Sequence, residues 1–236
     1  MFSLKQSTLL SPSFFDRDPR QVARALLGKV LVRKKSRAIL AGRIVETEAY
    51  LGVGDLAAHS AAGKTARNSV LFGPPGFAYV YFIYGNHYCL NVSCLPDGEA
   101  GGVLFRALEP IAGIELMAGA RRIEVSAKAV RPIESRIQAS SASGAEPRSK
   151  SAVMTGRPSV ATLKKISSGP GRMSEALGVT RERDNGKNLA SPRSDLQIVD
   201  DGYRARRIAV GPRIGITKSA DHPLRYVIAG NLFVSR

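Results

Sequence analysis

The spacing of apolar residues predicts a short amphipathic helix near the start of the chain. Asp18 is a typical N-cap acid, and Pro19 suits the first helical turn, where a proline sacrifices no hydrogen bond. Apolar side chains recur at the helical interval in 22–27 (VARALL), and Gly28 stands where helices commonly end. We therefore expect one helix between Asp18 and Gly28.

Two strand patterns follow this helix. Residues 29–34 (KVLVRK) and 38–50 (AILAGRIVETEAY) are rich in Val and Ile and flank a short basic turn at 35–37. A hairpin is the simplest connection between strands that lie so close in sequence.

Aromatic and β-branched residues predict a second hairpin. Residues 79–84 (YVYFIY) precede Gly85 and Asn86, a pair typical of a tight two-residue turn, and 87–93 alternate again. The tip of this hairpin is therefore expected to present Tyr84.

The third quarter of the chain has little pattern. Ile114 and Met117 mark a brief helix, whereas 138–152 (QASSASGAEPRSKSA) predicts a mobile loop. Between 121 and 157, eight Lys or Arg residues stand against three Glu in a background of Ser, Ala and Gly that cannot supply a core. We expect a disordered basic insertion at about 123–160 and no second domain.

Regular patterns return after this stretch. Pro170 suits the first turn of a helix, and Gly178 its end. The segments 206–211 (RRIAVG), 213–216 (RIGI) and 224–228 (LRYVI) then predict strands.

Length and composition are those of a single globular domain. A chain of 236 residues with 44% hydrophobic residues can be built around one core, and no internal repeat divides it. No stretch approaches the roughly 20 apolar residues of a membrane helix, and the first residues lack the features of a signal peptide. We expect one domain over residues 1–236, no membrane partner, and a cytoplasmic location, associated with the nucleoid if the source is bacterial.

The charge points to a polyanionic partner. The formal net charge is +16 and the sequence pI is about 10.4, so nucleic acid is the leading candidate. A basic composition is also common in ribosome-associated and other high-pI proteins. Charge alone does not identify which nucleic acid is bound.

The cysteines and histidines favour neither a disulfide nor a metal site. Cys89 and Cys94 fall in one predicted strand, where an odd separation of five residues places them on opposite faces. His59, His87 and His222 lack the spacing of zinc ligands, which argues against a zinc-dependent deaminase. Glycine-rich nucleotide loops are also absent from the sequence, so we expect no metal and no cofactor.

Two acids share one face of the predicted strand 38–50. Period-two alternation places Glu46, Glu48 and Tyr50 on the same side. The plain structural interpretation is an exposed face with solvated acids, because such residues are rarely buried without a partner. The alternative is a chemical site, and the surrounding sequence favours it.

Between Gly42 and Pro110 the chain contains GRIVETEAYLG, HSAAGKTARN, YVYFIYGNHYCLNVS and RALEP, and this block resembles the alkyladenine (3-methyladenine) DNA glycosylase family. Further similar segments are FFDRDPRQVARALLGKVLVRK, SSGPGRMSEALGV and IGITKSADHPLRYVIAGNLFVS. The resemblance covers nearly the whole chain except about 123–160. It implies an α+β domain in which a curved antiparallel sheet carries a protruding hairpin and is surrounded by helices.

The resemblance implies hydrolysis of the N-glycosidic bond of a damaged purine. Glu48 matches the catalytic acid that activates water, and Glu46 is expected to be a supporting or structural residue. Arg106 matches an arginine near the water and the target phosphate, although a structural ion pair with Glu109 is an alternative. No lysine matches a nucleophile, so the resemblance implies a monofunctional enzyme that leaves an abasic site.

A base inside a duplex must be flipped out before an enzyme can reach it. By resemblance, Tyr50, His59 and Tyr81 are the walls that sandwich the flipped base, and Tyr84 fills the gap that it leaves in the duplex. Asn91 matches the residue that obstructs the amino group of guanine. Without the resemblance, Tyr84 would be assigned to the core, His59 to packing or capping, and Asn91 to an ordinary strand position.

The expected partner is double-stranded DNA that carries 3-methyladenine, 7-methylguanine, hypoxanthine or ethenoadenine. Arg67 and Asn68 are expected to meet phosphates, as is Arg172 at the start of a helix. Asn86, beside Tyr84, is polar where relatives often have an apolar residue. We expect a monomer, which suits sliding on DNA. The rival hypothesis is a catalytically silent nucleic-acid-binding protein of the same fold.

Overall fold

A single antiparallel sheet organises the protein. The computed structural model describes residues 2–124 and 158–235. In these residues, seven strands follow the order β1-β7-β2-β3-β6-β5-β4, and β8 and β9 join the sheet at β3. The strands are β1 (Thr8–Leu9), β2 (Val30–Lys35), β3 (Ala38–Tyr50), β4 (Ala78–Ile83), β5 (His87–Ser93), β6 (Gly102–Ala112), β7 (Leu196–Asp200), β8 (Ile208–Gly211) and β9 (Arg225–Ile228).

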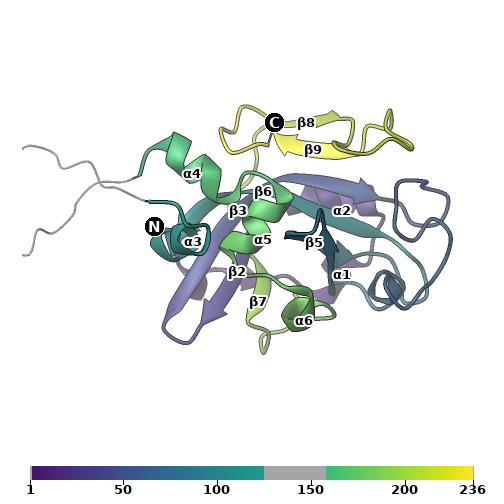
Figure 1. The fold of residues 1–236 in the computed structure, drawn as a ribbon. Helices are drawn as coiled ribbons and strands as arrows, with labels where there is room; N and C mark the ends of the chain where they lie inside the picture. Colours follow the sequence, from purple (N-terminus) through teal and green to yellow (C-terminus); the bar gives the residue numbers. More distant parts are fainter. Residues whose placement is uncertain (1, 125–157, 236) are drawn as a thin grey trace, which may run out of the picture.

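Short helices surround this sheet. In Figure 1, α3, α4 and α5 lie on the near side of the sheet, α2 lies behind it, and β8 and β9 run along its top. The α-helices are α1 (Pro12–Phe15), α2 (Pro19–Leu26), α3 (Ile114–Ala120), α4 (Val160–Ser167), α5 (Pro170–Ala176) and α6 (Arg181–Asp184). Two 3-10 helices cover η1 (Leu4–Gln6) and η2 (Ser69–Phe72). This arrangement confirms the predicted α+β class.

Strand β3 is the centre of the molecule. Its first half pairs with β2, nearly its full length pairs with β6, and residues 46–48 also pair with β9. On the rear face, Thr47 Oγ1 donates a hydrogen bond to the Ala23 carbonyl of α2 at 2.9 Å. Alternation along the strand therefore turns Glu46 and Glu48 to the front face.

The predicted first helix and first hairpin are confirmed. Asp18 accepts a hydrogen bond from the Arg20 amide at 2.8 Å, as an N-cap should, and Gly28 has a φ of 90° just beyond the helix end. The hairpin of β2 and β3 turns at residues 36 and 37. The brief helix at Ile114 and the helix that starts at Pro170 are also present, as α3 and α5.

The turn between β4 and β5 differs from its prediction. Ile83 pairs with His87, so the turn has three residues, Tyr84, Gly85 and Asn86, and not two. Tyr84 itself takes a left-handed φ of 54° and is 79% exposed. A core position for Tyr84 is therefore wrong, whereas its position at the hairpin tip is confirmed.

Other differences lie in the second half of the chain. The expected strand 213–216 is instead an irregular loop that includes Gly215 at a φ of 76°. Strands β6 and β7 and helix α4 were not predicted. The expected mobile loop 138–152 lies outside the described residues, as does most of the expected insertion 123–160. Cys89 and Cys94 are both free and buried.

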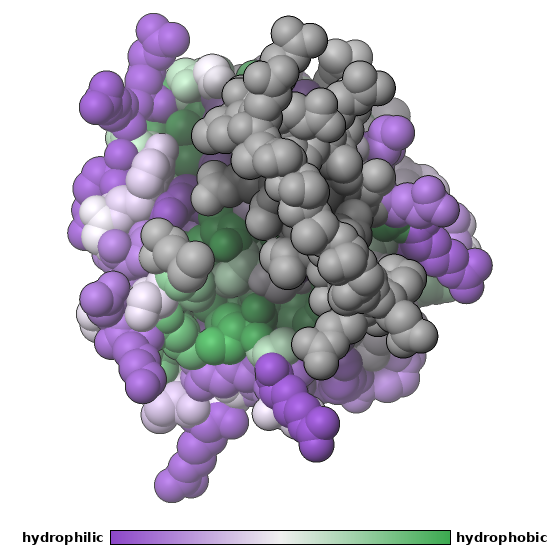
Figure 2. Space-filling view, turned by 90° about the vertical axis from the view of Figure 1, so that its left-hand side faces the viewer, coloured by the Kyte–Doolittle hydropathy of each residue, from purple (hydrophilic) through white to green (hydrophobic). Residues whose placement is uncertain are grey.

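Most of the core is continuous. One apolar cluster joins α2 and the helices α3 to α5 to the sheet, and a smaller one is centred on Val30, Val32, Ala41 and Val199. On the face shown in Figure 2, hydrophilic side chains project around the periphery, and a central area is apolar. Within this fold the charged residues Glu46 and Glu48 of β3 are fully buried.

Candidate active site

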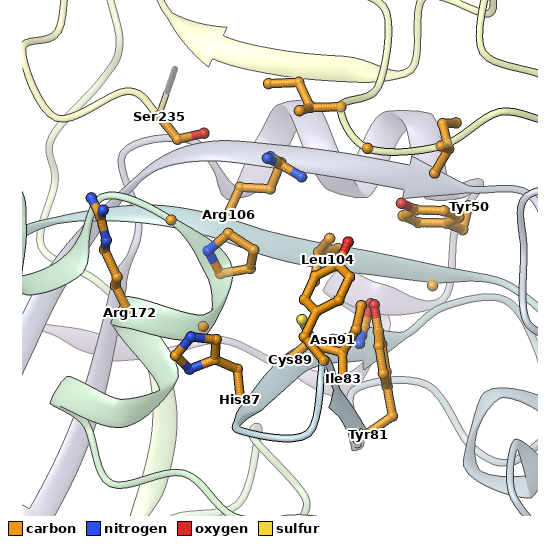
Figure 3. A pocket seen from close by; sticks show the side chains of 18 of the residues that line it. Tyr50, Tyr81, Ile83, His87, Cys89, Asn91, Leu104, Arg106, Arg172 and Ser235 are labelled. Atoms are coloured by element: carbon orange, nitrogen blue, oxygen red, sulfur yellow. The ribbon is translucent and has the colours of Figure 1, made fainter.

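A pocket of about 1110 Å³ opens on the front of the sheet. The hairpin of β4 and β5, the middle of β6, the start of α5 and the loop 213–216 all contribute to its wall. Figure 3 shows Tyr50 and Tyr81 at one end of the pocket and Arg172 and His87 at the other, with Arg106 between them. The pocket thus joins residues from distant parts of the sequence.

Both acids of β3 are buried beneath this pocket. Arg106 lies between them: its Nε donates to Glu46 Oε1 at 3.0 Å, and its Nη1 is 3.2 Å from Glu48 Oε1. The interpretation of an exposed strand face with solvated acids is therefore wrong. An ion pair of Arg106 with Glu109 is also wrong, since Glu109 instead accepts a hydrogen bond from Asn231.

Glu46 accepts four hydrogen bonds from its neighbours. Its Oε1 accepts hydrogen bonds from Arg106, from Arg225 Nε at 2.7 Å and from Ser235 Oγ at 2.9 Å, while its Oε2 accepts from the Ser235 amide at 2.6 Å. A carboxylate with this many donors has little capacity left for a water molecule.

Glu48 accepts fewer hydrogen bonds than Glu46. Its Oε1 accepts from the Ile214 amide at 2.8 Å and faces Arg106, whereas its Oε2 accepts only from the Tyr50 hydroxyl at 3.0 Å. Burial raises the pKa of Glu48, and Arg106, the Ile214 amide and the Tyr50 hydroxyl oppose this shift. A carboxylate with a raised pKa is better matched to proton transfer near neutral pH.

Aromatic rings form one end of the pocket. The ring centroids of His59 and Tyr81 are 4.4 Å apart, and Tyr50 lines the same space. His59 Nδ1 lies 2.8 Å from the Tyr79 hydroxyl. Burial lowers the pKa of His59, and the charge of Arg67 adds to this effect, so the imidazole is neutral at neutral pH. The structure therefore brings together the three residues expected to hold the base.

Tyr79 was not among the expected site residues. It lies two positions before Tyr81 on β4, so period-two alternation could have placed it on the same face. Its backbone carbonyl accepts a hydrogen bond from Asn91 Nδ2 at 3.1 Å. Asn91 is thereby held in the pocket wall, beside Cys89 in Figure 3.

The expected phosphate contacts divide into two groups. Arg67 and Arg172 are exposed, and Arg172 lies at the pocket beside Lys164 and Lys165, two lysines that the sequence patterns did not single out. Asn68, in contrast, is only 2% exposed.

The structure does not present Asn68 to a phosphate, because its amide is used inside its own loop. Its Nδ2 donates to the carbonyls of His59 at 2.9 Å and Gly63 at 3.0 Å, and its Oδ1 accepts from the Thr65 amide at 2.6 Å. Asn68 therefore fixes the loop that carries His59.

The described residues hold neither a metal cluster nor a membrane-spanning helix. Among residues 2–124 and 158–235, no cluster of three or more His, Cys, Asp or Glu side chains is arranged to hold a metal ion. No helix in the same residues has the length and apolar character needed to cross a membrane.

Comparison with known proteins decides the family. The sequence profile of the methylpurine-DNA glycosylase family matches residues 13–232. The chain belongs to this family. Membership confirms the predicted resemblance and the predicted enzyme class: the protein is a DNA glycosylase, a hydrolase of N-glycosyl bonds, and DNA is its substrate.

Individual relatives agree with this assignment. A protein of Koribacter versatilis (strain Ellin345) is 60% identical over 233 residues, which cover 99% of this chain and 96% of the relative. A protein of Burkholderia cenocepacia (strain HI2424) is 40% identical over 97% of this chain and 91% of its own length. One of Methanoculleus marisnigri is 38% identical over 96% of this chain and 98% of its own length. All three are named "Putative 3-methyladenine DNA glycosylase".

The neighbours Arg67 and Asn68 should respond differently to substitution in the glycosylase. We expect Asn68→Ala to lower the free energy of unfolding by about 2 kcal/mol, because it removes a buried amide with three partners. Arg67→Ala should change it by less than about 0.5 kcal/mol, because that side chain is exposed. Urea denaturation measures both, and equal midpoints for the two variants would contradict the structural role of Asn68.

Proposed function

We propose that the glycosylase flips a damaged purine into the pocket and hydrolyses its N-glycosidic bond with a water molecule activated by Glu48. The contrast between the two acids carries this proposal. Glu46 accepts four hydrogen bonds, from Arg106, Arg225 and Ser235, whereas Glu48 accepts two, from Ile214 and Tyr50, beside its ion pair with Arg106. Glu48 is therefore the acid with more lone-pair capacity left, and its partner Tyr50 lines the pocket.

The chemistry follows from this arrangement. Water attacks the sugar carbon while the base departs with the electrons of the N-glycosidic bond, and Glu48 accepts the proton that the water loses. The ionised carboxylate also stabilises positive charge that develops on the sugar. Arg106 keeps Glu48 oriented and is available to the target phosphate. With water as the nucleophile, the product is an abasic site and the strand stays intact.

The aromatic end of the pocket suits a flipped purine. Stacking on Tyr50, Tyr81 and His59 contributes about 1 to 3 kcal/mol per base. Tyrosine faces also attract cationic, alkylated purines. We therefore propose 3-methyladenine, 7-methylguanine, hypoxanthine and ethenoadenine as substrates, with Asn91 obstructing the amino group of normal guanine.

The hairpin tip and the basic rim suit a duplex. Tyr84 projects from the three-residue turn and can fill the gap left by the flipped nucleotide. Arg67 and Arg172 are exposed cations near the pocket that can bind phosphates on either side of the lesion. The enzyme would act on double-stranded DNA as a monomer, since the acid and the aromatic residues proposed for the reaction come from one chain.

The decisive experiment compares the wild type with Glu48→Gln. The substrate is a duplex oligonucleotide with one hypoxanthine or one ethenoadenine, and alkali cleavage reveals the abasic product. We expect the excision rate of the variant to fall at least about 100-fold, because the carboxylate that accepts the proton from water is gone. The variant should still bind the lesion as before. Excision by Glu48→Gln at the wild-type rate would remove Glu48 from the mechanism, and binding without excision by the wild type would favour a silent binding protein.

The pH profile should report the environment of Glu48. The acid must be deprotonated to accept a proton, and burial raises its pKa, so excision of a neutral lesion should fall on acidification at a pH above the ordinary 4.5 of a glutamate. Arg106 lowers this pKa, so Arg106→Gln should move the acidic limb to higher pH. Arg225→Gln is the matched control, since the Arg225 side chain binds Glu46 and the Ser235 carbonyl but not Glu48. If the acidic limb of the pH profile does not move in Arg106→Gln, the assignment of this limb to Glu48 is contradicted.

Tyr84→Ala should slow excision of paired lesions by about 10-fold or more, because the flipped state loses a side chain that fills the duplex. Lesions placed opposite a mismatch should be affected less, since their flipping costs less. Phe82→Ala provides the control, because Phe82 lies on the same hairpin, is 47% exposed and is on the strand face opposite Tyr81. Equal effects of both substitutions would mean that the hairpin, and not Tyr84, is the important element.

A further inference from the structure

A buried ion pair lies directly outside the aromatic end of the pocket. Arg213 donates from Nη1 to Asp55 Oδ2 at 2.6 Å and from Nη2 to Asp55 Oδ1 at 2.8 Å. Both side chains are at most 2% exposed. Arg213 also donates to the carbonyls of Ala49 at 3.1 Å and Ser219 at 3.3 Å, so the guanidinium is fixed by three segments of the chain. Such a fixed, buried cation calls for an explanation, because burying charge is costly.

The guanidinium of Arg213 stacks on the outer face of Tyr50. Its central carbon lies 4.6 Å from the Tyr50 ring centroid, within the range of a cation–π interaction. Tyr50 also lines the pocket, and in Figure 3 it lies beneath the pale-yellow loop of the C-terminal part of the chain. The proposed base wall thus has a permanent cation behind it.

Arg213 also acts on Glu48, through its neighbour in the sequence. The next residue, Ile214, donates its backbone amide to Glu48 Oε1 at 2.8 Å. Because Arg213 ties this loop to Asp55 and to the Ala49 carbonyl, it fixes the amide against Glu48. One side chain therefore sets the position of both the base wall and the carboxylate.

We propose that Arg213, held by Asp55, is a positioning and specificity-determining residue that lowers the preference of the pocket for cationic lesions relative to neutral ones. This rests on the proposed function, in which Tyr50 stacks on the flipped base. An aromatic ring that already faces a cation on one side attracts a second cation less strongly on the other, since the ring electrons are drawn outward and the two charges repel. A neutral purine does not experience this repulsion.

The proposal concerns two classes of lesion with similar shapes. 7-Methylguanine carries a positive charge in DNA, whereas hypoxanthine is neutral. The two lesions also differ in the amino group that Asn91 is proposed to obstruct, but Asn91 is the same in every variant compared, so a change in their ratio reports the charge behind Tyr50. Removing that charge should favour the cationic lesion selectively.

The test uses the full-length protein and two duplexes that differ only in the lesion, 7-methylguanine or hypoxanthine. The variant Arg213→Met with Asp55→Asn removes both charges together and leaves no unpaired carboxylate. We expect the ratio of single-turnover excision rates, 7-methylguanine over hypoxanthine, to rise about threefold to tenfold relative to the wild type. Arg213→Lys keeps the charge, so its ratio should stay within about twofold of the wild type even where both rates fall.

A second buried pair supplies the matched control. Arg33 and Asp184 are 2.7 Å apart, equally buried, and absent from the pocket lining; Arg33 also pairs with Asp195, and Asp184 with Lys187 and Arg183, so the charges left behind keep partners. Arg33→Met with Asp184→Asn should change stability but leave the lesion ratio unaltered. Where a rate falls below detection, the ratio of affinities for the two duplexes in a Glu48→Gln background replaces it.

An unchanged ratio in the Arg213 and Asp55 double variant, or an equal rise in the Arg33 control, would overturn the proposal. Neither result would touch the proposed function, because that depends on excision by the wild type and its loss in Glu48→Gln. If the wild type excises neither lesion, both the proposed function and the proposal for Arg213 are contradicted.

Discussion

The structure depends on one constraint: two carboxylates on the same strand face are buried two residues apart. Like charges this close in a poorly solvated site repel strongly, and a cation between them offsets this repulsion. Arg106 lies between Glu46 and Glu48 and contacts both. Arg225 adds a second cation to Glu46, and the amides of Ile214 and Ser235 complete the set. The C-terminal part of the chain therefore supplies partners that offset the cost of burying Glu46 and Glu48.

This constraint separates the two acids into different environments. The donors around Glu46 hold Arg106 in place and use up the carboxylate, which agrees with a supporting role. Glu48 receives less compensation, and burial leaves its pKa raised. Two identical side chains on one strand thus lie in different environments, solely because their neighbours differ.

Local patterns could predict the elements that local interactions determine. The N-cap at Asp18, the alternation of β3 and the exposed tip at Tyr84 all follow from short-range rules, and the family resemblance located the pocket residues. The three-residue turn escaped prediction because Tyr84 takes a left-handed φ, which a bulky residue seldom does. The segment 213–216 has the composition of a strand, yet its Ile214 amide serves Glu48. Partners more than 150 residues apart, such as Ser235 with Glu46 and Arg213 with Asp55, leave no local pattern.

The position of Ser235 has a practical consequence for handling the enzyme. Ser235 both lines the pocket and binds Glu46, so a fluorophore attached at position 235 would lie at the pocket and replace the hydroxyl that Glu46 accepts from. The amino end, in contrast, joins the sheet through β1, at the edge opposite the hairpin strand β4. A label on β1 would therefore lie at the other edge of the sheet from the hairpin that lines the pocket.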